Sequence, residues 1–318
     1  MRQRRLGKTE LKVSEIGFGA WAIGGTGYGP VRDEDSLGAL EAAWANGINF
    51  YDSADSYGNG HSETLLGRFL KGKPRGEIVI ATKGGHDFYH GAVKKDFTPA
   101  HLQFACEQSL KRLGTDHIDL YQLHTPSLEV LRGGEAVDAL EKLQKAGKIR
   151  FIGVSVYAEN EAMAVFQDPR IAALQVVFNL LDQRMGRVVF PDARRHDVGL
   201  IVREPLACGL LTGKYNVRSK FEKTDHRSGW PPEKLELDLK KIEMLGRVLA
   251  TRRISMARSA LEYILEHDTI STVIPGIKTA DQVEENIQAS LDPRLRSQES
   301  SHLRDMYMRE PVFEEGLD

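Results

Sequence analysis

Four polar residues of this chain have the types needed to move a proton to or from a carbonyl oxygen. Asp52 closes the apolar run NFYD and Tyr57 follows it, whereas Lys83 closes IVIATK and His124 closes LYQLH. An ammonium beside a phenol favours the phenolate, and a carboxylate keeps that ammonium charged. A neutral imidazole can orient a carbonyl oxygen. The set therefore predicts a proton donor beside an electrophilic pocket, which suits the reduction or formation of a carbonyl.

Each of the four residues has a structural interpretation when it is considered alone. Asp52 and Lys83 could form an ordinary ion pair, and Tyr57 and His124 could simply pack in the core. All four, however, come at or just beyond the ends of successive apolar runs. In a parallel barrel those ends meet on one face, so we expect the side chains to converge there and to share hydrogen bonds. Convergence favours a catalytic role without identifying the reaction.

The elements that would position these residues alternate along the chain. Short runs rich in Val, Ile, Leu and Phe are typical of parallel strands covered by helices. Eight such runs predict strands over Glu15–Phe18, Ile48–Tyr51, Ile78–Ala81, Ile118–Leu123, Ile149–Val154, Ala173–Val177, Leu200–Val202 and Thr272–Ile274. The segments around them predict helices over Asp33–Asn46, Ser62–Leu70, Pro99–Leu113, Glu135–Ala146, Glu159–Phe166, Val189–Arg195, Arg252–His267 and Asp281–Ser290. This alternation predicts an α/β fold, a (β/α)8 TIM barrel that occupies residues 1–318 as a single domain.

Other segments interrupt the alternation. A small hairpin is expected over 3–14, formed by Arg4–Leu6 and Lys12–Val13, at the bottom of the barrel. Extended loops are expected after the third strand, over Gly84–Phe97, and after the seventh strand, over 207–250. Loops at the C-terminal ends of barrel strands carry binding sites in many enzymes. The polar tail, 292–318, could order over the barrel or stay loose.

Composition excludes several classes of protein. The 318 residues hold 43 Lys and Arg against 45 Asp and Glu, so no basic excess indicates nucleic-acid binding. Neither cysteine, Cys106 or Cys208, belongs to a Cys-x-x-Cys pair, so we expect a reducing compartment. The basic N-terminus lacks the apolar segment of a signal peptide, and no apolar run is long enough to span a membrane. We therefore expect a soluble cytoplasmic protein, and the oligomeric state stays open.

The order and spacing of several segments resemble the aldo-keto reductase superfamily. The resemblance runs from about Leu6 to Ala289 and rests on GKTELKVSEIGFGAW, DSADSYGNGHSETLLG, LGTDHIDLYQLH, GKIRFIGVS, QVVFNLLDQR, PLACGLLTGKY and VIPGIKTADQVEENI. It implies hydride transfer with a nicotinamide cofactor that lies extended across the barrel mouth. It also implies that Tyr57 is the general acid, that Lys83 tunes its pKa with support from Asp52, and that His124 orients the substrate carbonyl.

The resemblance further implies which residues bind the cofactor. Ser155 and Gln175 would meet the nicotinamide carboxamide, and Phe178 would stack on the ring. Asp52 and three residues of the first loop would line the nicotinamide side: Gly19, Ala20 and Trp21. The pyrophosphate would lie in the loop that contains Pro205, Leu206, Cys208, Gly209, Leu210, Gly213 and Lys214. The adenosine end would meet Pro275, Gly276, Lys278, Thr279, Gln282, Glu285 and Asn286, with Lys278, Thr279 and Gln282 near a 2′-phosphate.

Some positions depart from the family pattern. Val156 stands where many members have Asn, Phe178 where many have Tyr, and Glu204 where many have Ser. An acid near a pyrophosphate needs a partner, for which Arg203 and Lys214 are candidates. Some relatives have Arg or Lys where Gly276 or Gln282 stand here, which leaves Lys278 as the main cation for a 2′-phosphate. NADP(H) is the favoured cofactor, and NAD(H) is the alternative.

The substrate pocket is expected to have aromatic walls. They would come from Trp21, Tyr28, Phe88, Tyr89, Tyr157 and Trp230. Such walls suit sugars, aliphatic aldehydes, aromatic carbonyls and steroids alike, so the partner is a small carbonyl or alcohol of unspecified class.

Three other functions are compatible with the sequence, and two of its motifs resemble binding sites. The chain could be an NAD-dependent sugar or alcohol dehydrogenase of the same family, a cofactor-binding regulatory subunit with little turnover, or an unrelated barrel enzyme acting on phosphorylated sugars. The match of Gly17–Ala22 to G-x-G-x-x-G/A is interpreted as accidental, because a loop and not a helix follows it. His86 and His90 have metal-ligand spacing without an obvious third ligand, so no metal is expected.

Overall fold

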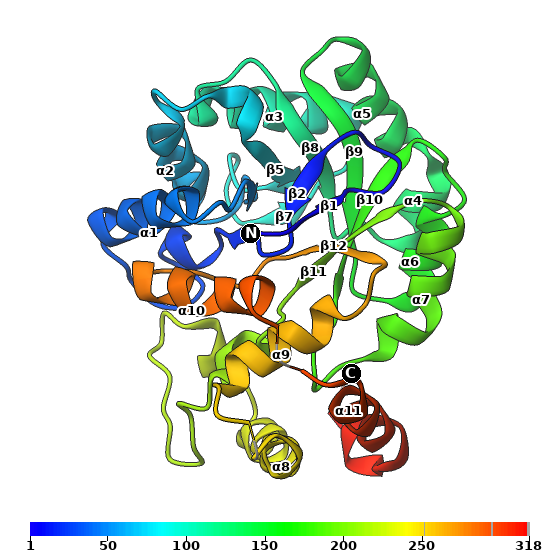
Figure 1. Cartoon of the computed structure of the whole chain (residues 1–318). Coiled ribbons are helices and arrows are strands. Elements are labelled where there is room, and N and C mark those ends of the chain that lie inside the picture. Colours follow the sequence, from blue (N-terminus) through cyan, green and yellow to red (C-terminus); the bar gives the residue numbers. More distant parts are fainter. Residues whose placement is uncertain (251, 294, 317–318) are drawn as a thin grey trace.

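Eight parallel strands form one curled sheet in the part of the chain that the computed structural model describes, residues 1–250, 252–293 and 295–316. In chain order they are β3 Phe18–Gly19, β4 Phe50–Asp52, β5 Val79–Gly84, β8 Ile118–His124, β9 Ile149–Ser155, β10 Ile171–Val177, β11 Gly199–Arg203 and β12 Ile270–Val273. Each strand pairs with the next, and parallel bridges from Ile16 to Val273 and from Gly19 to Gly276 join the first strand to the last. The expected (β/α)8 fold is confirmed (Figure 1).

Helices surround the sheet in Figure 1. They are α1 Asp33–Ala45, α2 His61–Leu70, α3 Pro99–Leu113, α5 Glu135–Lys145, α6 Glu159–Val165, α7 Arg184–Arg195, α9 Met256–Leu265 and α10 Ala280–Leu291, with a short α4 Leu128–Gly133 that the sequence analysis missed. The caps explain several of the ends: the Thr98 hydroxyl accepts a hydrogen bond from the His101 amide, and Gly114 adopts a left-handed conformation with φ of 63°.

Two helices have bounds that differ from the expected ones. Helix α7 begins at Arg184 and not at Val189, because the buried Met185 extends its apolar face by one turn. Helix α9 begins at Met256 and not at Arg252, because the Ser255 hydroxyl accepts a hydrogen bond from the Arg258 amide and so caps the helix at that point.

A hairpin covers the N-terminal ends of the strands. Strands β1 Gln3–Arg5 and β2 Lys12–Ser14 pair antiparallel, and the connecting turn buries Leu6 and Leu11. These leucines pack in one cluster with Phe50 and other residues from the starts of the barrel strands. Gly7 is required in the turn, because a Cβ there would lie 2.2 Å from the Gly199 amide nitrogen. The hairpin therefore closes this end of the barrel, and the opposite end is left for a site.

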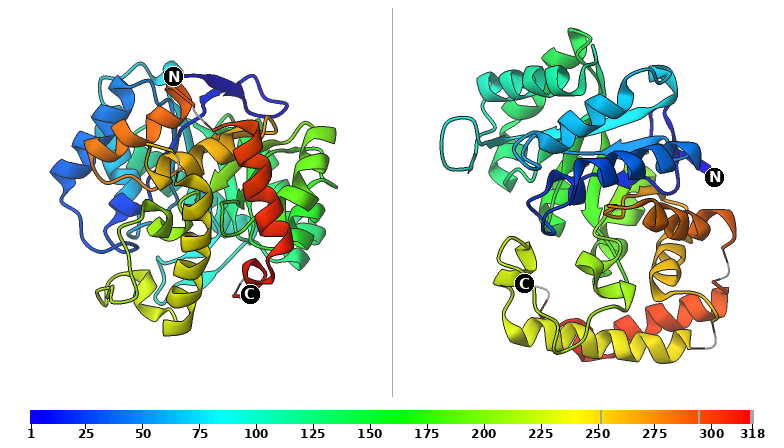
Figure 2. Two further views of the ribbon diagram at one scale, coloured as in Figure 1. Left: turned by 60° about the horizontal axis from the view of Figure 1, so that its bottom comes forward. Right: turned by 90° about the vertical axis from the view of Figure 1, so that its left-hand side faces the viewer.

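The long segments contain secondary structure of their own. The segment after β5 forms a small hairpin of β6 His86–Asp87 and β7 Lys94–Lys95. The segment after β11, expected as a loop, contains short 3-10 turns, η3 Ala207–Thr212 and η4 His226–Gly229, and the helix α8 Pro232–Leu249. In the C-terminal tail, α11 Ser297–Arg309 packs against α8 and a 3-10 turn follows at Pro311–Phe313 (Figure 2). The described part of the tail is therefore ordered.

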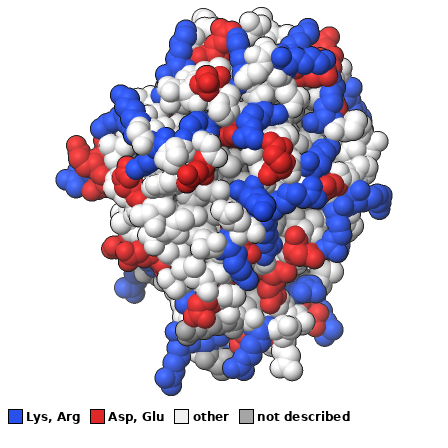
Figure 3. All heavy atoms as spheres, turned by 45° about the horizontal axis from the view of Figure 1, so that its top comes forward, with Lys and Arg blue, Asp and Glu red and all other residues white. Residues whose placement is uncertain are grey.

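The surface and the helices agree with the balanced composition. On the face drawn in Figure 3, positive and negative side chains are interspersed. Among the described helices, none has both the length and the apolar character needed to cross a membrane.

Candidate active site

The C-terminal ends of the strands bring the four predicted catalytic residues together around one buried ammonium. Lys83 of β5 is fully buried, and its Nζ donates to Asp52 Oδ2 at 2.6 Å, to the Ser53 carbonyl at 2.7 Å and to the Tyr57 hydroxyl at 3.3 Å. The ring of His124, the last residue of β8, lies edge-on to the ring of Tyr57 with centroids 5.7 Å apart. Asp52 thus contacts Lys83, Lys83 contacts Tyr57, and the ring of Tyr57 lies beside that of His124.

Two glutamines hold the other oxygen of Asp52. The amide groups of Gln122 on β8 and Gln175 on β10 donate to Asp52 Oδ1 at 3.0 and 2.9 Å. The sequence analysis missed Gln122, although its position two residues before His124 places both side chains on the same face of a strand. Gln175 was expected at a carboxamide and instead donates to Asp52, while its own oxygen accepts from the Ser155 hydroxyl at 3.5 Å.

Burial and charge shift the pKa values of these groups in different directions. Burial raises the pKa of Tyr57 by more than the neighbouring Lys83 lowers it, so the phenol is protonated at neutral pH. Burial alone would lower the pKa of Lys83, but Asp52 and Tyr57 outweigh it and the pKa is raised. Burial, with Lys83 and other cations, holds the pKa of His124 well below its usual value. The arrangement therefore combines a neutral phenol, a charged ammonium and a neutral imidazole.

The β6–β7 hairpin contributes a residue to this group. The ring of His86 lies 4.4 Å from that of His124, centroid to centroid, and burial lowers its pKa as well. Among the described residues, none offers a hydrogen-bond partner to the buried His124 Nδ1. His86 was considered only as a metal ligand in the sequence analysis, because the loop that carries it has no periodic pattern.

A cavity of about 830 Å³ opens beside these residues and holds three of the six expected aromatic walls. Trp21, Tyr157 and Trp230 line it, and the Trp21 ring lies 6.1 Å from that of Tyr57. Tyr28 lines the neighbouring cavity instead. The cavity lining also includes His226 and Cys208, and both come from the long segment after β11.

Phe88 and Tyr89, expected among the walls of the substrate pocket, do not belong to the described lining of this cavity. Their rings stack on each other at 4.1 Å, and the Tyr89 hydroxyl accepts a hydrogen bond from Arg112 at 2.9 Å. Arg112 is held there by the buried Glu63, at 2.7 Å. The guanidinium of Arg112, on α3, lies 6.0 Å from the centroid of the Phe88 ring and 5.7 Å from that of the Tyr89 ring.

Phe178 is likewise corrected, because its ring lies on the outside of the barrel. It packs against Phe190 and His267, with centroids 4.9 and 5.2 Å away, between α7 and the segment after α9. The position beside the barrel mouth is filled by Arg203 at the end of β11, whose guanidinium lies 3.9 Å over the Tyr157 ring. Its position at a strand end was the signal that could have identified Arg203.

The acid in the expected pyrophosphate loop has a partner. Glu204 Oε1 lies 2.6 Å from the Arg203 guanidinium, which is the first of the two pairings considered from the sequence. Glu204 and Cys208 both have positive φ, at 53° and 54°, so the loop follows a tight path that ordinary residues rarely adopt.

A second cavity, of about 370 Å³, lies along this loop and the start of α10. Lys214, Arg227 and Lys278 bring three positive charges to it, and Thr279 caps the N-terminus of α10 that points there. Burial lowers the pKa of Lys278, with Arg227 and Lys214 acting in the same direction against Asp225. Positive charges that repel one another are stabilised when an anion binds between them, and a helix N-terminus also favours an anion. The cavity therefore suits the phosphates of a dinucleotide.

The lining of this second cavity includes most of the residues predicted for the pyrophosphate and the adenosine end. From that set it contains Pro205, Leu206, Cys208, Gly209, Lys214, Gly276, Lys278, Gln282, Glu285 and Asn286. Leu210, Gly213, Pro275 and Thr279 are not part of the described lining, and Leu210 is buried in the hydrophobic core. Lys278 Nζ donates to the Tyr28 carbonyl at 2.5 Å, and the Lys278 amide donates to Gln282 Oε1 at 2.7 Å. Arg227 was missed because it lies in the long segment after β11.

Metal-ligand residue types gather at one place in the described chain. Ligand atoms of Asp87, Asp96 and His101 lie within 4.8 Å of one another. Asp87 is engaged by His90 Nδ1 at 3.1 Å, and Asp96 by the Thr98 hydroxyl at 2.7 Å. His86 and His90 do not form a pair of metal ligands, because His86 lies against His124 and His90 contacts Asp87.

Comparison with known proteins relates this geometry to one family. The model of the Aldo/keto reductase family matches residues 15–307. The fold is similar to that of an aldo-keto reductase from Bacillus halodurans in its holo form, with a TM-score of 0.81, 32% identity and coverage of 96% of each chain. The chain is 29% identical to the NADH-specific methylglyoxal reductase of Escherichia coli (strain K12), over 96% of this chain and 98% of the relative. It is 33% identical to an aldo-keto reductase of Schizosaccharomyces pombe whose name specifies NADP(+), over 87% and 84%.

The buried ion pair gives a first testable expectation. Lys83→Met leaves the Asp52 carboxylate buried without its counter-ion, so the free energy of unfolding should fall by about 3–5 kcal/mol, as measured by urea denaturation. Adding Asp52→Asn removes the unpaired charge and should recover part of that loss. Lys145→Met, which breaks an exposed pair with Glu141 on a helix surface, should cost less than about 1 kcal/mol. Equal losses for the two lysine variants would contradict this account of the site.

Proposed function

Because the chain belongs to the aldo/keto reductase family, we propose that this NAD(P)-dependent oxidoreductase uses NADP(H) to interconvert an aldehyde or ketone with the alcohol. The observation that carries the proposal is the fully buried Lys83, which connects the Asp52 carboxylate to the Tyr57 hydroxyl. An ion pair needed only for stability would not require a phenol within hydrogen-bond distance of its ammonium.

The two cavities and the strand ends beside them would hold a dinucleotide. Gly19, Ala20 and Trp21 would line the nicotinamide end, with Asp52, Ser155 and Gln175 below it. The backbone of the loop after β11 and Lys214 would bind the pyrophosphate, while Lys278 and the N-terminus of α10 would meet a 2′-phosphate. When it is bound, the nicotinamide supplies the hydride. Arg203, at the end of β11, would take the position beside the ring that Phe178 was expected to fill.

Tyr57 would donate the proton in the reduction direction. Its hydroxyl is protonated at neutral pH and lies beside the Lys83 ammonium, which stabilises the phenolate that forms when the proton leaves. His124, neutral and close to Tyr57, would donate a hydrogen bond to the carbonyl oxygen and orient it. Asp52 keeps Lys83 charged, and the two glutamines keep Asp52 in place. In the oxidation direction the same phenolate would accept the proton from the alcohol.

The aromatic cavity would bind a small carbonyl compound. Trp21, Tyr157 and Trp230 supply apolar faces, and Trp21 also lies beside the Tyr57 ring. Methylglyoxal, which appears in the name of one relative, has the size and carbonyl chemistry that such a site accepts.

One observation favours NAD(H) as the second candidate for the cofactor. Lys278 and Gln282, the residues expected at the 2′-phosphate, already make hydrogen bonds to the Tyr28 carbonyl and the Lys278 amide. A 2′-phosphate would have to compete with the Tyr28 carbonyl for the Lys278 ammonium. With NAD(H) those hydrogen bonds would persist, and the chain would act as a dehydrogenase or an NADH-dependent reductase.

Removal of the phenol hydroxyl tests the proton donor. Tyr57→Phe should lower kcat for NADPH-dependent reduction of methylglyoxal by a factor of about 10² to 10⁴, because no phenol remains to donate a proton to the carbonyl oxygen in the transition state. The Kd for NADPH, measured by quenching of Trp fluorescence, should stay within about twofold. Tyr307→Phe, on α11 and far from Lys83, is the matched control and should leave kcat unchanged. A Tyr57→Phe variant with wild-type kcat would contradict the assignment.

The pKa shifts predict the dependence of the reaction on pH. Reduction needs the protonated phenol, so its rate is lost as the pH rises through the Tyr57 pKa, which burial has raised above its usual value near 10. The rate of reduction should therefore stay level between about pH 7 and pH 9, and the rate of oxidation should rise with pH. Burial keeps His124 neutral, so no step should occur near pH 6.5. Steady-state rates in both directions measure this, and a fall in reduction between about pH 7 and pH 8 would contradict it.

The cofactor preference can be tested at Lys278. Lys278→Gln should raise the Kd for NADPH by about tenfold, because it removes one charge-assisted contact to the 2′-phosphate. The Kd for NADH, which lacks that phosphate, should change by less than about twofold, and Lys223→Gln in the exposed loop before η4 should change neither. Equal weakening of both cofactors would place Lys278 elsewhere than at the 2′-phosphate and would favour the NAD(H) alternative.

A further inference from the structure

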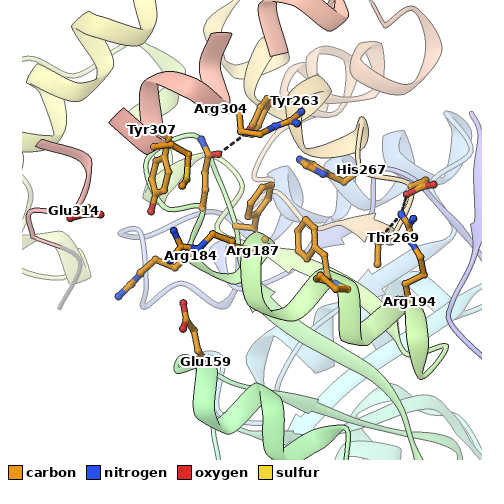
Figure 4. Close-up of a pocket in the computed structure, with 17 residues that line it drawn as sticks. Glu159, Arg184, Arg187, Arg194, Tyr263, His267, Thr269, Arg304, Tyr307 and Glu314 are labelled. Carbon is orange, nitrogen blue, oxygen red and sulfur yellow. Dashed lines mark hydrogen bonds and ion pairs between the residues drawn. The ribbon is translucent and has the colours of Figure 1, made fainter. Parts of the chain in front are cut away.

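A cavity of about 1020 Å³ lies on the outside of the barrel, next to the 830 Å³ cavity, with which it shares the lining residues Glu159 and Arg184. Its walls come from α7, from Tyr263 of α9 and the residues just after that helix, from α11, and from Phe178 after β10. None of Asp52, Tyr57, Lys83 or His124 belongs to the described lining. In Figure 4, Tyr263 and Arg304 lie on one side of this space, and Arg184 and Arg187 lie on the other.

The inner walls of the cavity are aromatic. The rings of Phe178 and Tyr263 are nearly parallel, with an interplanar angle of 14° and centroids 6.1 Å apart, and Phe190 contacts Phe178. Tyr307 of α11 adds a fourth ring to the lining. Four aromatic side chains around one space suit a ligand with a flat apolar body.

A buried amide group among the residues that line this cavity has an unsatisfied N–H. Gln183 is only 7% exposed, and its oxygen accepts a hydrogen bond from the Tyr263 hydroxyl at 2.6 Å. In the part of the chain that the structure describes, its Nε2 has no acceptor. Leaving a buried N–H unsatisfied costs about 1–3 kcal/mol, so an acceptor atom on a ligand would recover that free energy.

The charges around the cavity favour an anion. Arg184 is paired with Asp182 at 2.9 Å, and Arg194 is paired with Asp268. Arg187 makes no hydrogen bond or ion pair among the described residues, whereas Arg304 lies against the Tyr263 hydroxyl.

The remaining titratable groups around the cavity do not cancel its excess of positive charge. Glu159 faces Arg184, and Glu314 is exposed at the rim. Burial, together with Arg304, lowers the pKa of His267 to about 4, so this residue is neutral at physiological pH. Among the residues that the structure describes, no carboxylate pairs with the guanidinium group of Arg187 or of Arg304.

We propose that this cavity is a binding site for an amphipathic organic anion, one whose aromatic or alicyclic body packs among the four rings and whose carboxylate or sulfonate meets Arg187 and the Gln183 amide. The volume is that of sites for ligands of drug-like size. The site does not depend on the proposed reductase activity, since it shares no residue of the proton-transfer group.

Fluorescent probes test the site on the full-length chain. The protein is titrated with 1-anilinonaphthalene-8-sulfonate and, separately, with N-phenyl-1-naphthylamine, which has the same rings without the sulfonate. The wild type should bind one sulfonate probe per chain, and more tightly than the neutral probe. Arg187→Gln should raise the Kd of the sulfonate probe by about tenfold, which equals about 1.4 kcal/mol. The Kd of the neutral probe should change by less than about twofold.

Controls separate this cavity from other apolar surfaces. Arg195→Gln is the matched variant on α7, because Arg195 is exposed, pairs with Asp192 and does not line the cavity; it should bind both probes as the wild type does. Saturating NADPH should leave the binding of the sulfonate probe unchanged. The proposal is overturned by an absence of probe binding, by wild-type affinity in Arg187→Gln, or by displacement of the probe on addition of NADPH.

Discussion

The ammonium of Lys83 is the group on which the rest of the site depends. A charge buried this completely is tolerated only when its partners are fixed in place. Asp52 supplies the opposite charge from the neighbouring strand, and the Ser53 carbonyl and Tyr57 hydroxyl complete the donor set. The strand register that makes these contacts also places His124 next to Tyr57. Pairing of one cation therefore determines the relative positions of all four residues.

The same burial produces the contrast in protonation that the chemistry requires. A low-dielectric environment disfavours the charged form of every group, so it raises the pKa of a phenol and lowers that of an imidazole. Tyr57 and His124 are consequently both neutral and both able to donate a hydrogen bond near neutral pH. Lys83 escapes this rule only because Asp52 is beside it. A site built from one charged pair and two neutral donors suits a reaction in which negative charge develops on an oxygen.

Much of this arrangement could be predicted from the sequence, and the failures have physical reasons. Strand ends and residue types identified Asp52, Lys83 and His124, because parallel strands must deliver their ends to one face. The position of Phe178 was predicted wrongly because a residue just beyond a strand can turn to either side of the sheet. Here its ring packs against Phe190 and His267 on the outside of the barrel.

Other failures arose in the irregular segments. Phe88 and Tyr89 lie in a loop whose path is determined by the buried pair of Glu63 and Arg112, a long-range contact that local pattern does not reveal. Arg227 belongs to an insertion without periodicity. The position of Gln122, by contrast, could have been predicted from the two-residue repeat of a strand, because it lies two residues before His124 on β8.

The seam of the barrel has a consequence for how the chain is made. The first and last strands meet through the bridges from Ile16 to Val273 and from Gly19 to Gly276, so their partners are separated by more than two hundred residues of sequence. During synthesis from the N-terminus, the early strands can curl and pair with their neighbours, but the sheet has a free edge until β12 leaves the ribosome. Gly276 also lines the expected cofactor cavity, close to Ala22 from the first loop. The nascent chain therefore acquires a closed barrel and the complete lining of this cavity in the same late event.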